Sequence, residues 1–168
     1  NWGPHIVDHS LQFLGAPLKS LWSDLKRIAA VGDAEDHLKL VLTGENGRIV
    51  DMEISGGAAI SAPEYLILGT RGALTANGNT ITLRYLDPKV DLPAREADPG
   101  TPGTSFGTPE TLPWIEETIS VAPAKSYNIW DELHAAVRCG AAFPITLDEA
   151  VEVMRVISMA REGTEFVI

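Results

Sequence analysis

The feature that most constrains the fold is a period-two pattern of apolar residues in the first half of the chain. Leucine stands at every second position of residues 38–42, which is the period of a β-strand with one buried face. The turn-forming sequence GENG at 44–47 and a second alternating run at 49–54 follow, so we expect a β-hairpin here. Further strands are expected in three segments, residues 20–27, 64–68 and 80–86. Consecutive strands joined by tight turns predict a mostly antiparallel sheet.

Segments with helical periodicity flank these strands, at 4–14, 126–138 and 146–162. The first has a proline in its opening turn and stops at Gly15, a residue that commonly ends helices. The last opens with T-x-x-E at 146–149, the sequence of a capping box. Its expected inner face consists of Leu147, Ala150, Val151, Met154 and Ile157. Strands and helices do not alternate, so the order predicts an α+β fold, an open antiparallel sheet with helices on one face.

Residues 87–124 interrupt this regular pattern. They are rich in proline and glycine and lack periodicity, so we expect a long surface loop, which is an interface arm, a mobile segment or a plain excursion. The whole chain, residues 1–168, has a length typical of one domain. Because Asn1 is not an initiator methionine and a helix-like segment follows it at once, we expect a chain cut from a longer protein.

Charge and composition exclude several classes of partner. The chain has 13 Lys and Arg against 23 Asp and Glu, a net charge of −10, whereas nucleic acids and anionic membranes attract basic surfaces. We therefore expect neither nucleic acid nor a membrane as a partner. No apolar run reaches the roughly 20 residues that span a bilayer. The single cysteine, Cys139, cannot form an internal disulfide, which favours a reducing, cytoplasmic location.

Sequence motifs for nucleotide binding and for nucleophilic catalysis are absent. The adjacent glycines of GGAAIS at 56–61 lack the G-x-G-x-x-G spacing, so no phosphate-binding loop is recognisable. There is no G-x-S-x-G sequence, and Cys139 stands at a helix end without a marked histidine partner. Any chemistry of this chain must therefore come from other residues.

The polar cluster at the start of the chain offers two kinds of chemistry. His5 and His9 are about one helical turn apart, a spacing that suits two metal ligands, but no clear third ligand follows and we assign no metal. Alternatively, His5 alone suits acid–base work. The helix dipole at the first turn favours a neutral imidazole, which can accept a proton from a hydroxyl group. A purely structural role for His5 stays open on residue chemistry alone.

Motifs at both ends of the chain resemble those of one protein family. The pattern G-P-H-x-x-D-x-x-x-x-x-x-G at 3–15 is similar to the start of the C-terminal domain of the glucose–fructose oxidoreductase/inositol dehydrogenase (Gfo/Idh/MocA) family. The segments YNIWDELHAAVRCG (127–140) and PITLDEAVEVMRVISMARE (144–162) resemble the closing helices of that domain. The resemblance covers nearly the whole chain.

The resemblance implies a single substrate-binding and dimerisation domain over residues 1–168, preceded in the full protein by a Rossmann domain that this chain lacks. The full protein would transfer hydride reversibly between NAD or NADP, bound by the missing domain, and a sugar, polyol or related hydroxyl compound. No cofactor is then expected on this chain, which should be inactive alone. The resemblance also implies a homodimer or higher homo-oligomer through the sheet.

The resemblance also assigns site residues. The family's catalytic D-x-x-x-H pattern places the acid/base on His5 and puts Asn1 where the family has aspartate. Asparagine can hydrogen-bond but adds no charge to hold an imidazolium ion. Trp2 and Asp8 are the candidate substrate-binding residues, although Asp8, like His9, also suits a structural role. The departure at Asn1 leaves an alternative open, a catalytically inactive binding or sensing module of the same fold.

Overall fold

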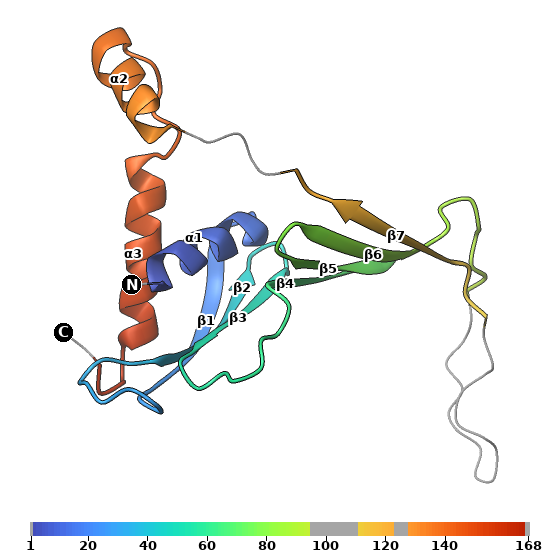
Figure 1. Cartoon of the computed structure of the whole chain (residues 1–168), viewed down its shortest axis with the longest axis horizontal. Coiled ribbons are helices and arrows are strands. Elements are labelled where there is room, and N and C mark those ends of the chain that lie inside the picture. Colours follow the sequence, from blue (N-terminus) through green and yellow to red (C-terminus); the bar gives the residue numbers. More distant parts are fainter. Residues whose placement is uncertain (1, 95–110, 123–127, 167–168) are drawn as a thin grey trace. The chain divides into compact units, whose positions relative to one another are not determined.

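The computed structural model describes residues 2–94, 111–122 and 128–166. Figure 1 shows the elements along the chain, in the order α1 (Gly3–Leu14), β1 (Leu18–Lys26), β2 (His37–Gly44), β3 (Ile49–Ser55), β4 (Tyr65–Gly69), β5 (Gly72–Asn77), β6 (Thr80–Leu86), β7 (Trp114–Ser120), α2 (Ile129–Cys139) and α3 (Leu147–Arg161). These elements fall into two compact units. Unit 1 comprises Asn1–Ile60 and Asn128–Ile168, and unit 2 comprises Ser61–Tyr127.

Unit 1 contains a three-stranded antiparallel sheet with the strand order β1-β2-β3. Helix α1 packs against β2 and β3, and helix α3 packs against β1 and α1, so both helices cover the same face (Figure 1). The predicted α+β class, with antiparallel strands and helices on one face of a sheet, is therefore confirmed. None of the helices in the described ranges is both long and apolar enough to cross a membrane.

The predicted hairpin is present, and its turn is tied to the first helix. Leu40 pairs with Met52 across β2 and β3, and the turn closes with a hydrogen bond from the Gly44 amide to the Arg48 carbonyl oxygen at 2.9 Å. The Asn46 side chain donates to the carbonyl oxygen of Leu14 at 2.9 Å. The turn thereby satisfies one of the carbonyl groups left open at the C-terminal end of α1.

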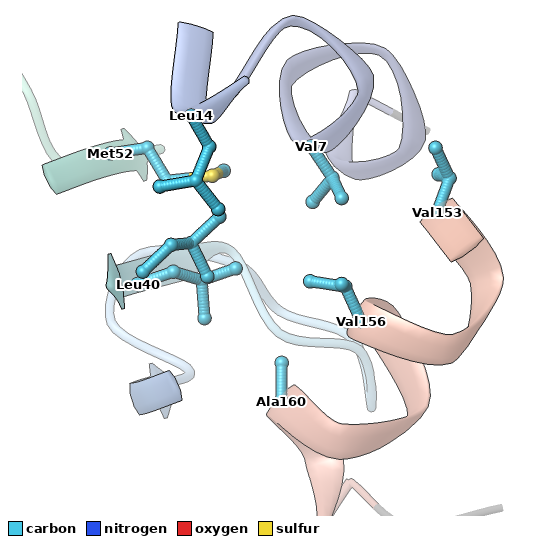
Figure 2. Packing of buried hydrophobic residues seen from close by; sticks show 8 residues of the cluster. Val7, Leu14, Leu40, Met52, Val153, Val156 and Ala160 are labelled. Atoms are coloured by element: carbon cyan, nitrogen blue, oxygen red, sulfur yellow. The ribbon is translucent and has the colours of Figure 1, made fainter. Parts of the chain in front are cut away.

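The core of unit 1 lies between the helices and the sheet. Figure 2 shows Leu14 of α1 above Leu40 and Met52 of the sheet, and Val7 facing the side chains of α3. The buried members of this cluster are Val7, Leu14, Leu40, Leu42, Met52, Val153, Val156 and Ala160. Since burial of an aliphatic side chain stabilises by roughly 1.5–3 kcal/mol, this cluster supplies the main driving force for folding unit 1.

Helix α3 is where it was predicted, but its inner face is not. The capping box is confirmed, because the Glu149 amide donates to Thr146 Oγ1 at 3.2 Å and the Thr146 amide donates to Glu149 Oε2 at 2.7 Å. The buried residues, however, are Val153, Val156 and Ala160.

The apolar stripe that was predicted to face the core is exposed over most of its length. Leu147 is 85% exposed, Val151 65% and Met154 56%, whereas Ile157 packs against the core as predicted. Helix α3 carries apolar side chains on two sides, and helical periodicity selects the longer stripe. The core uses the other stripe because α1 and β1 meet the C-terminal part of the helix.

Unit 2 is a four-stranded antiparallel meander with the strand order β4-β5-β6-β7. Its last strand corrects the sequence prediction, since Trp114–Ser120 was expected within a surface loop and instead pairs with β6 from end to end. Proline and glycine on the N-terminal side hid the short alternating sequence WIEETIS. Residues 95–110 and 123–124 of the predicted loop lie outside the described residues.

The two faces of the sheet in unit 2 differ in composition, because side chains alternate along each strand and residues paired in register share a face. We call one face the tyrosine face; it consists of Tyr65, Ile67, Leu74, Ala76, Ile81, Leu83, Tyr85, Ile115, Glu117 and Ile119. The other, the arginine face, consists of Leu66, Leu68, Ala73, Thr75, Asn77, Thr80, Thr82, Arg84, Leu86, Trp114, Glu116, Thr118 and Ser120. Within unit 2, the described residues form only strands and their connections, so neither face is covered from inside that unit.

Candidate functional site

Helix α1 presents the polar cluster that the sequence singled out. The helix starts at Gly3 with Pro4 in its first turn, and Trp2 occupies the N-cap position without a side-chain capping bond. The Ile6 amide closes the first turn on the Trp2 carbonyl oxygen at 3.2 Å. The helix ends at Gly15, which adopts the left-handed conformation with φ +62° that glycine tolerates best. The predicted helix at 4–14 is thus confirmed with one more residue at its start.

One face of α1 packs into the core, and the opposite face carries the exposed histidines. Val7, Ser10 and Leu14 are buried, and the Ser10 hydroxyl contacts the Met52 sulfur at 3.4 Å across the core. His5 and His9 are exposed, on the opposite side of the helix from Val7 and Leu14. His5 therefore has no role in the core, and its imidazole is available to a molecule outside unit 1.

The two candidate substrate-binding residues have different surroundings. The Trp2 ring is 70% exposed, so the site end of α1 carries an apolar surface beside a polar one. Asp8 is half-buried, and its Oδ2 accepts a hydrogen bond from Gln12 Nε2 at 3.1 Å. This bond links two side chains one turn apart and is compatible with the structural alternative for Asp8. Contact with a substrate stays a prediction for both residues.

Two further expectations concern the same cluster. Asn1, at the position where the family has aspartate, lies outside the described residues. In the part of the chain that the structure describes, no three His, Cys, Asp or Glu side chains gather as metal ligands would. His5 and His9 thus have no described third ligand, and we develop no metal chemistry for them.

A second polar cluster, at Asp36, is structural. Its Oδ1 accepts from the Ile28 amide at 2.7 Å, and its Oδ2 accepts from the Ala29 and Ala30 amides at 2.8 and 2.7 Å. These backbone donors, led by that of Ile28, hold the pKa of the Asp36 carboxyl below its usual value. The carboxylate thereby fixes the loop between β1 and β2, and its hydrogen bonds leave no evident role toward a ligand.

The described residues do not form a dinucleotide-binding site. Such sites are built at the carboxyl ends of parallel strands, where a glycine-rich turn leads into a helix. Both sheets here are antiparallel throughout, and the adjacent glycines Gly56 and Gly57 follow β3 and lead into an irregular segment. NAD or NADP therefore does not fit these residues, as expected if another domain binds it.

Sequence reasoning missed one cluster altogether, on the arginine face of unit 2. The Arg84 guanidinium carbon lies 5.1 Å from the centre of the Trp114 ring, and Arg84 Nε lies 3.2 Å from Glu116 Oε1. The signal was present in the alternation of WIEETIS, which would have placed Trp114 and Glu116 on one face of a strand. Assigning this segment to a loop concealed it.

Comparison with known proteins defines the class of this fold. Solved structures of oxidoreductases share it at low sequence identity, and three of them illustrate the match. An NAD-binding protein from Listeria innocua is 20% identical with a TM-score of 0.70, the match covering 96% of this chain and 44% of that one. The oxidoreductase YvaA from Bacillus subtilis is 17% identical with a TM-score of 0.72, and the match covers 97% of this chain and 48% of that one. UDP-N-acetylglucosamine 3-dehydrogenase from Acidithiobacillus ferrooxidans is 16% identical with a TM-score of 0.63, and the match covers 97% of this chain and 47% of that one.

A family model matches the first part of the sequence. Residues 1–75 match the sequence profile of the GFO/IDH/MocA C-terminal domain, so the resemblance inferred from the motifs of the chain is confirmed. No curated protein matches the sequence. The chain spans about half the length of the solved structures it matches.

Proposed function

We propose that this chain is the substrate-binding half of an NAD(P)-dependent oxidoreductase that acts on a sugar, a polyol or a related hydroxyl compound, with His5 as the acid/base. In an oxidation of this class the substrate carbon loses a hydride to the nicotinamide and the hydroxyl group loses its proton. Only the second transfer would involve a residue of this chain, with the imidazole of His5 taking the proton from the substrate hydroxyl. The UDP-sugar dehydrogenase among the similar structures supports a sugar-like substrate.

The position of His5 is the observation that carries the proposal. Its side chain is exposed in the first turn of α1, while the other side of the same helix is anchored in the core. The anchored helix fixes the backbone at His5, so the imidazole extends from a defined point toward a molecule outside unit 1.

Exposed apolar side chains on two helices support the presence of a further domain in the full protein. None of the described residues of α2 is buried, and Trp130 and Val137 are among its exposed apolar side chains. The stripe of α3 that includes Leu147, Val151 and Met154 is exposed as well. Apolar stripes at helical spacing usually pack against another element, and the similar structures are about twice as long as this chain.

The role of His5 is tested by substitution in the full protein. We expect His5→Ala to lower turnover by about 10²–10⁴-fold, the usual contribution of a positioned acid/base. His9→Ala is the matched control, because His9 is also exposed and lies one turn further along the same helix; we expect it to leave turnover nearly unchanged. Near-normal turnover of the His5 variant would return His5 to a structural role.

Asn1 motivates the second candidate function, a binding or sensing module of the same fold that has lost catalysis. An aspartate at this position would hold an imidazolium ion by charge, which asparagine cannot do. The two functions are distinguished by assaying the full protein for reduction of NAD or NADP with a panel of sugars and polyols. Binding of a panel member without any reduction, in a protein whose Asn1→Asp variant gains activity, would establish the module instead of the enzyme.

Cofactor binding by another domain gives a direct expectation for the isolated chain. NADH at sub-millimolar concentration should not raise its melting temperature, because a ligand stabilises only the fold that binds it. The control is the full protein, which the same NADH concentration should stabilise. A clear shift for the isolated chain would disprove the assignment of the cofactor to another domain.

For the oligomer, we propose a homodimer in which two copies meet through the tyrosine face of unit 2. This face is apolar over most of its area, and Tyr85 and Glu117 form its polar exception, with the tyrosine hydroxyl donating to Glu117 Oε1 at 2.6 Å. Within the described residues of unit 2, no second layer covers it. An open apolar sheet face of this kind is typical of surfaces that pack against another layer.

Two neighbouring residues test the dimer, because adjacent residues of a strand point to opposite faces. Leu83→Glu places a charge on the tyrosine face and should convert the dimer to a monomer in sedimentation experiments. Thr82→Glu places the same charge on the arginine face and should leave the dimer intact. A monomeric wild-type chain, or a dimer that survives Leu83→Glu, would rule out this interface.

A further inference from the structure

The arginine face of unit 2 contains a hollow that none of the functions above uses. Three residues paired in register cross it from strand to strand, Leu68 on β4, Ala73 on β5 and Arg84 on β6. Ala73 is short, so a depression forms between the longer side chains on either side. The resulting cavity has a volume of about 390 Å³, and the Trp114 ring and Arg71 also line it.

The Arg84 guanidinium is held in place by two neighbours on β7. Its Cζ lies 5.1 Å from the centre of the Trp114 ring, within the range of a cation–π interaction. Its Nε lies 3.2 Å from Glu116 Oε1. A guanidinium carries five N–H donors, so an ion pair through Nε leaves donors for a further anion.

Arg71 brings a second positive charge to the same hollow. Its Nη2 donates to the carbonyl oxygens of Val90 at 3.3 Å and of Asp87 at 3.5 Å. Carbonyl groups position a guanidinium without cancelling its charge. In a chain with a net charge of −10, two arginines that share one cavity make a local positive site, which Glu116 offsets only in part.

The rest of the lining is apolar. Leu68 and Trp114 are both exposed. Leu68 offers an aliphatic surface and the Trp114 ring a flat one, on either side of Ala73. Exposed aromatic and aliphatic groups next to a fixed guanidinium suit a ligand that is part apolar and part anionic, since each part gains from a different wall.

We infer that this hollow binds a small organic anion, a carboxylate or a phosphate attached to a flat apolar group. The anion accepts hydrogen bonds from Arg84 and Arg71, and the apolar group packs on Trp114 and Leu68. Glu116 is a competitor of the anion for Arg84 and limits its affinity. This site does not involve His5, so the inference holds or fails independently of the proposed catalysis.

The binding is measured by NMR on the ¹⁵N-labelled chain, with the indole signal of Trp114 assigned by comparison with Trp114→Phe. Benzoate and phenyl phosphate are the two aryl anions, and their relative affinities identify the preferred head group. Inorganic phosphate and benzyl alcohol each carry one half of the ligand. We expect saturable shifts of the Trp114 indole and of the Arg71 and Arg84 amides with at least one aryl anion. Inorganic phosphate and benzyl alcohol should each bind at least about tenfold more weakly than that aryl anion.

Three variants give the inference a specific signature. Arg84→Gln should lower the affinity for the tighter-binding aryl anion by about tenfold or more. The control Arg138→Gln, a substitution of an exposed arginine in unit 1, should leave the affinity for this anion unchanged. Glu116→Gln should raise the affinity for the same anion, because the competing carboxylate is removed while the shape of the side chain is kept. A purely structural role for the Arg84 cluster predicts no such gain.

Several results would overturn the inference. The first is the absence of a saturable shift with either aryl anion, or shifts confined to signals other than the Trp114 indole and the Arg71 and Arg84 amides. The second is equal affinity for inorganic phosphate and phenyl phosphate. The third is unchanged binding in Arg84→Gln. Because Glu116→Gln keeps Arg84 and Trp114 in place, weaker binding by that variant would also overturn it even if Arg84→Gln failed to fold.

Discussion

The two units of the chain contain the same kind of sheet in very different surroundings. In unit 1, helices α1 and α3 cover β1–β3 and bury Leu40, Leu42 and Met52. In unit 2, Leu86 is the buried apolar side chain among the described residues of β4–β7, and Ile67 and Ile119 of the tyrosine face are exposed. An antiparallel sheet with one apolar face needs a second layer to bury that face. Unit 1 supplies its own layer from the chain, and unit 2 has a face suited to a layer from another molecule.

The comparison also separates two kinds of stabilisation. Consecutive strands of each sheet are paired in both units, with one register irregularity between Leu18 and Ser20 of β1, so backbone hydrogen bonds alone do not distinguish the units. Burial of apolar area is what differs, and it is the dominant favourable term in folding. The candidate catalytic residue His5 therefore belongs to the unit whose sheet is covered by its own helices, whereas the proposed contact surfaces belong to the unit with open sheet faces.

The largest expected difference between the units comes from the same substitution in each sheet. Leu42→Ala, at a side chain that is 0% exposed, should lower the free energy of unfolding by about 2–5 kcal/mol. Leu66→Ala, at a side chain that is 61% exposed, should change it by no more than about 0.5 kcal/mol. Urea denaturation followed by circular dichroism measures both. Equal losses would mean that the sheet of unit 2 is covered after all.

A smaller effect is expected at the helix caps, where packed and unpacked helices are compared. Thr146→Ala removes the N-cap of α3, which joins the core, and should lower the free energy of unfolding by about 1 kcal/mol. Asn128→Ala removes the N-cap of α2, whose side chain accepts from the Trp130 amide at 3.2 Å. Because α2 buries no residue, the unfolding midpoint should stay the same and only helical content should fall. A shifted midpoint for Asn128→Ala would show that α2 is part of the core.

The smallest effects concern acid and alkali, and one group in each unit illustrates them. In unit 1 the pKa values of Asp36 and Glu149 are lowered, by the Ile28 and Thr146 amides respectively. A lowered pKa stabilises the fold above the ordinary carboxyl pKa, and this stabilisation is lost as the pH falls through the folded-state pKa. The melting-temperature difference between wild type and Asp36→Asn should therefore shrink from about pH 5 to about pH 3.

Unit 2 should respond at the opposite end of the pH scale. The hydrogen bond to Glu117 raises the pKa of Tyr85 above its usual value, because ionisation would remove the donor and place two negative charges side by side. A raised pKa stabilises the fold below the ordinary tyrosine pKa, and this stabilisation is lost as the pH rises through the folded-state pKa. Tyr85→Phe should remove this alkaline loss and leave the acid response unchanged, as melting curves at both extremes would show.

Local patterns predicted the parts of the structure that depend on local physics. The leucine alternation of residues 38–42 identified β2, and the GENG turn identified the hairpin, because strand period and turn chemistry are properties of short segments. The capping box at Thr146 and Glu149 was predicted for the same reason, since both partners lie within one turn.

Tertiary choices were harder to predict. Helix α3 has two apolar stripes, and only the positions of α1 and β1 decide that Val153 and Val156 face the core. Strand β7 was hidden by prolines on one side, and with it the cluster of Trp114 and Arg84. Family resemblance placed the candidate site on His5, and the structure supplies what no pattern could, namely the exposure of its side chain.

Unit 1 is assembled from two separated parts of the chain, and this has a consequence for synthesis on the ribosome. The β2–β3 hairpin is made before Val153, Val156 and Ala160, which complete its cover. The roughly 100 intervening residues take about 5–20 s to translate. During that time Leu40, Leu42 and Met52 lack the part of their cover that α3 supplies, and this exposed apolar surface favours aggregation until α3 leaves the exit tunnel.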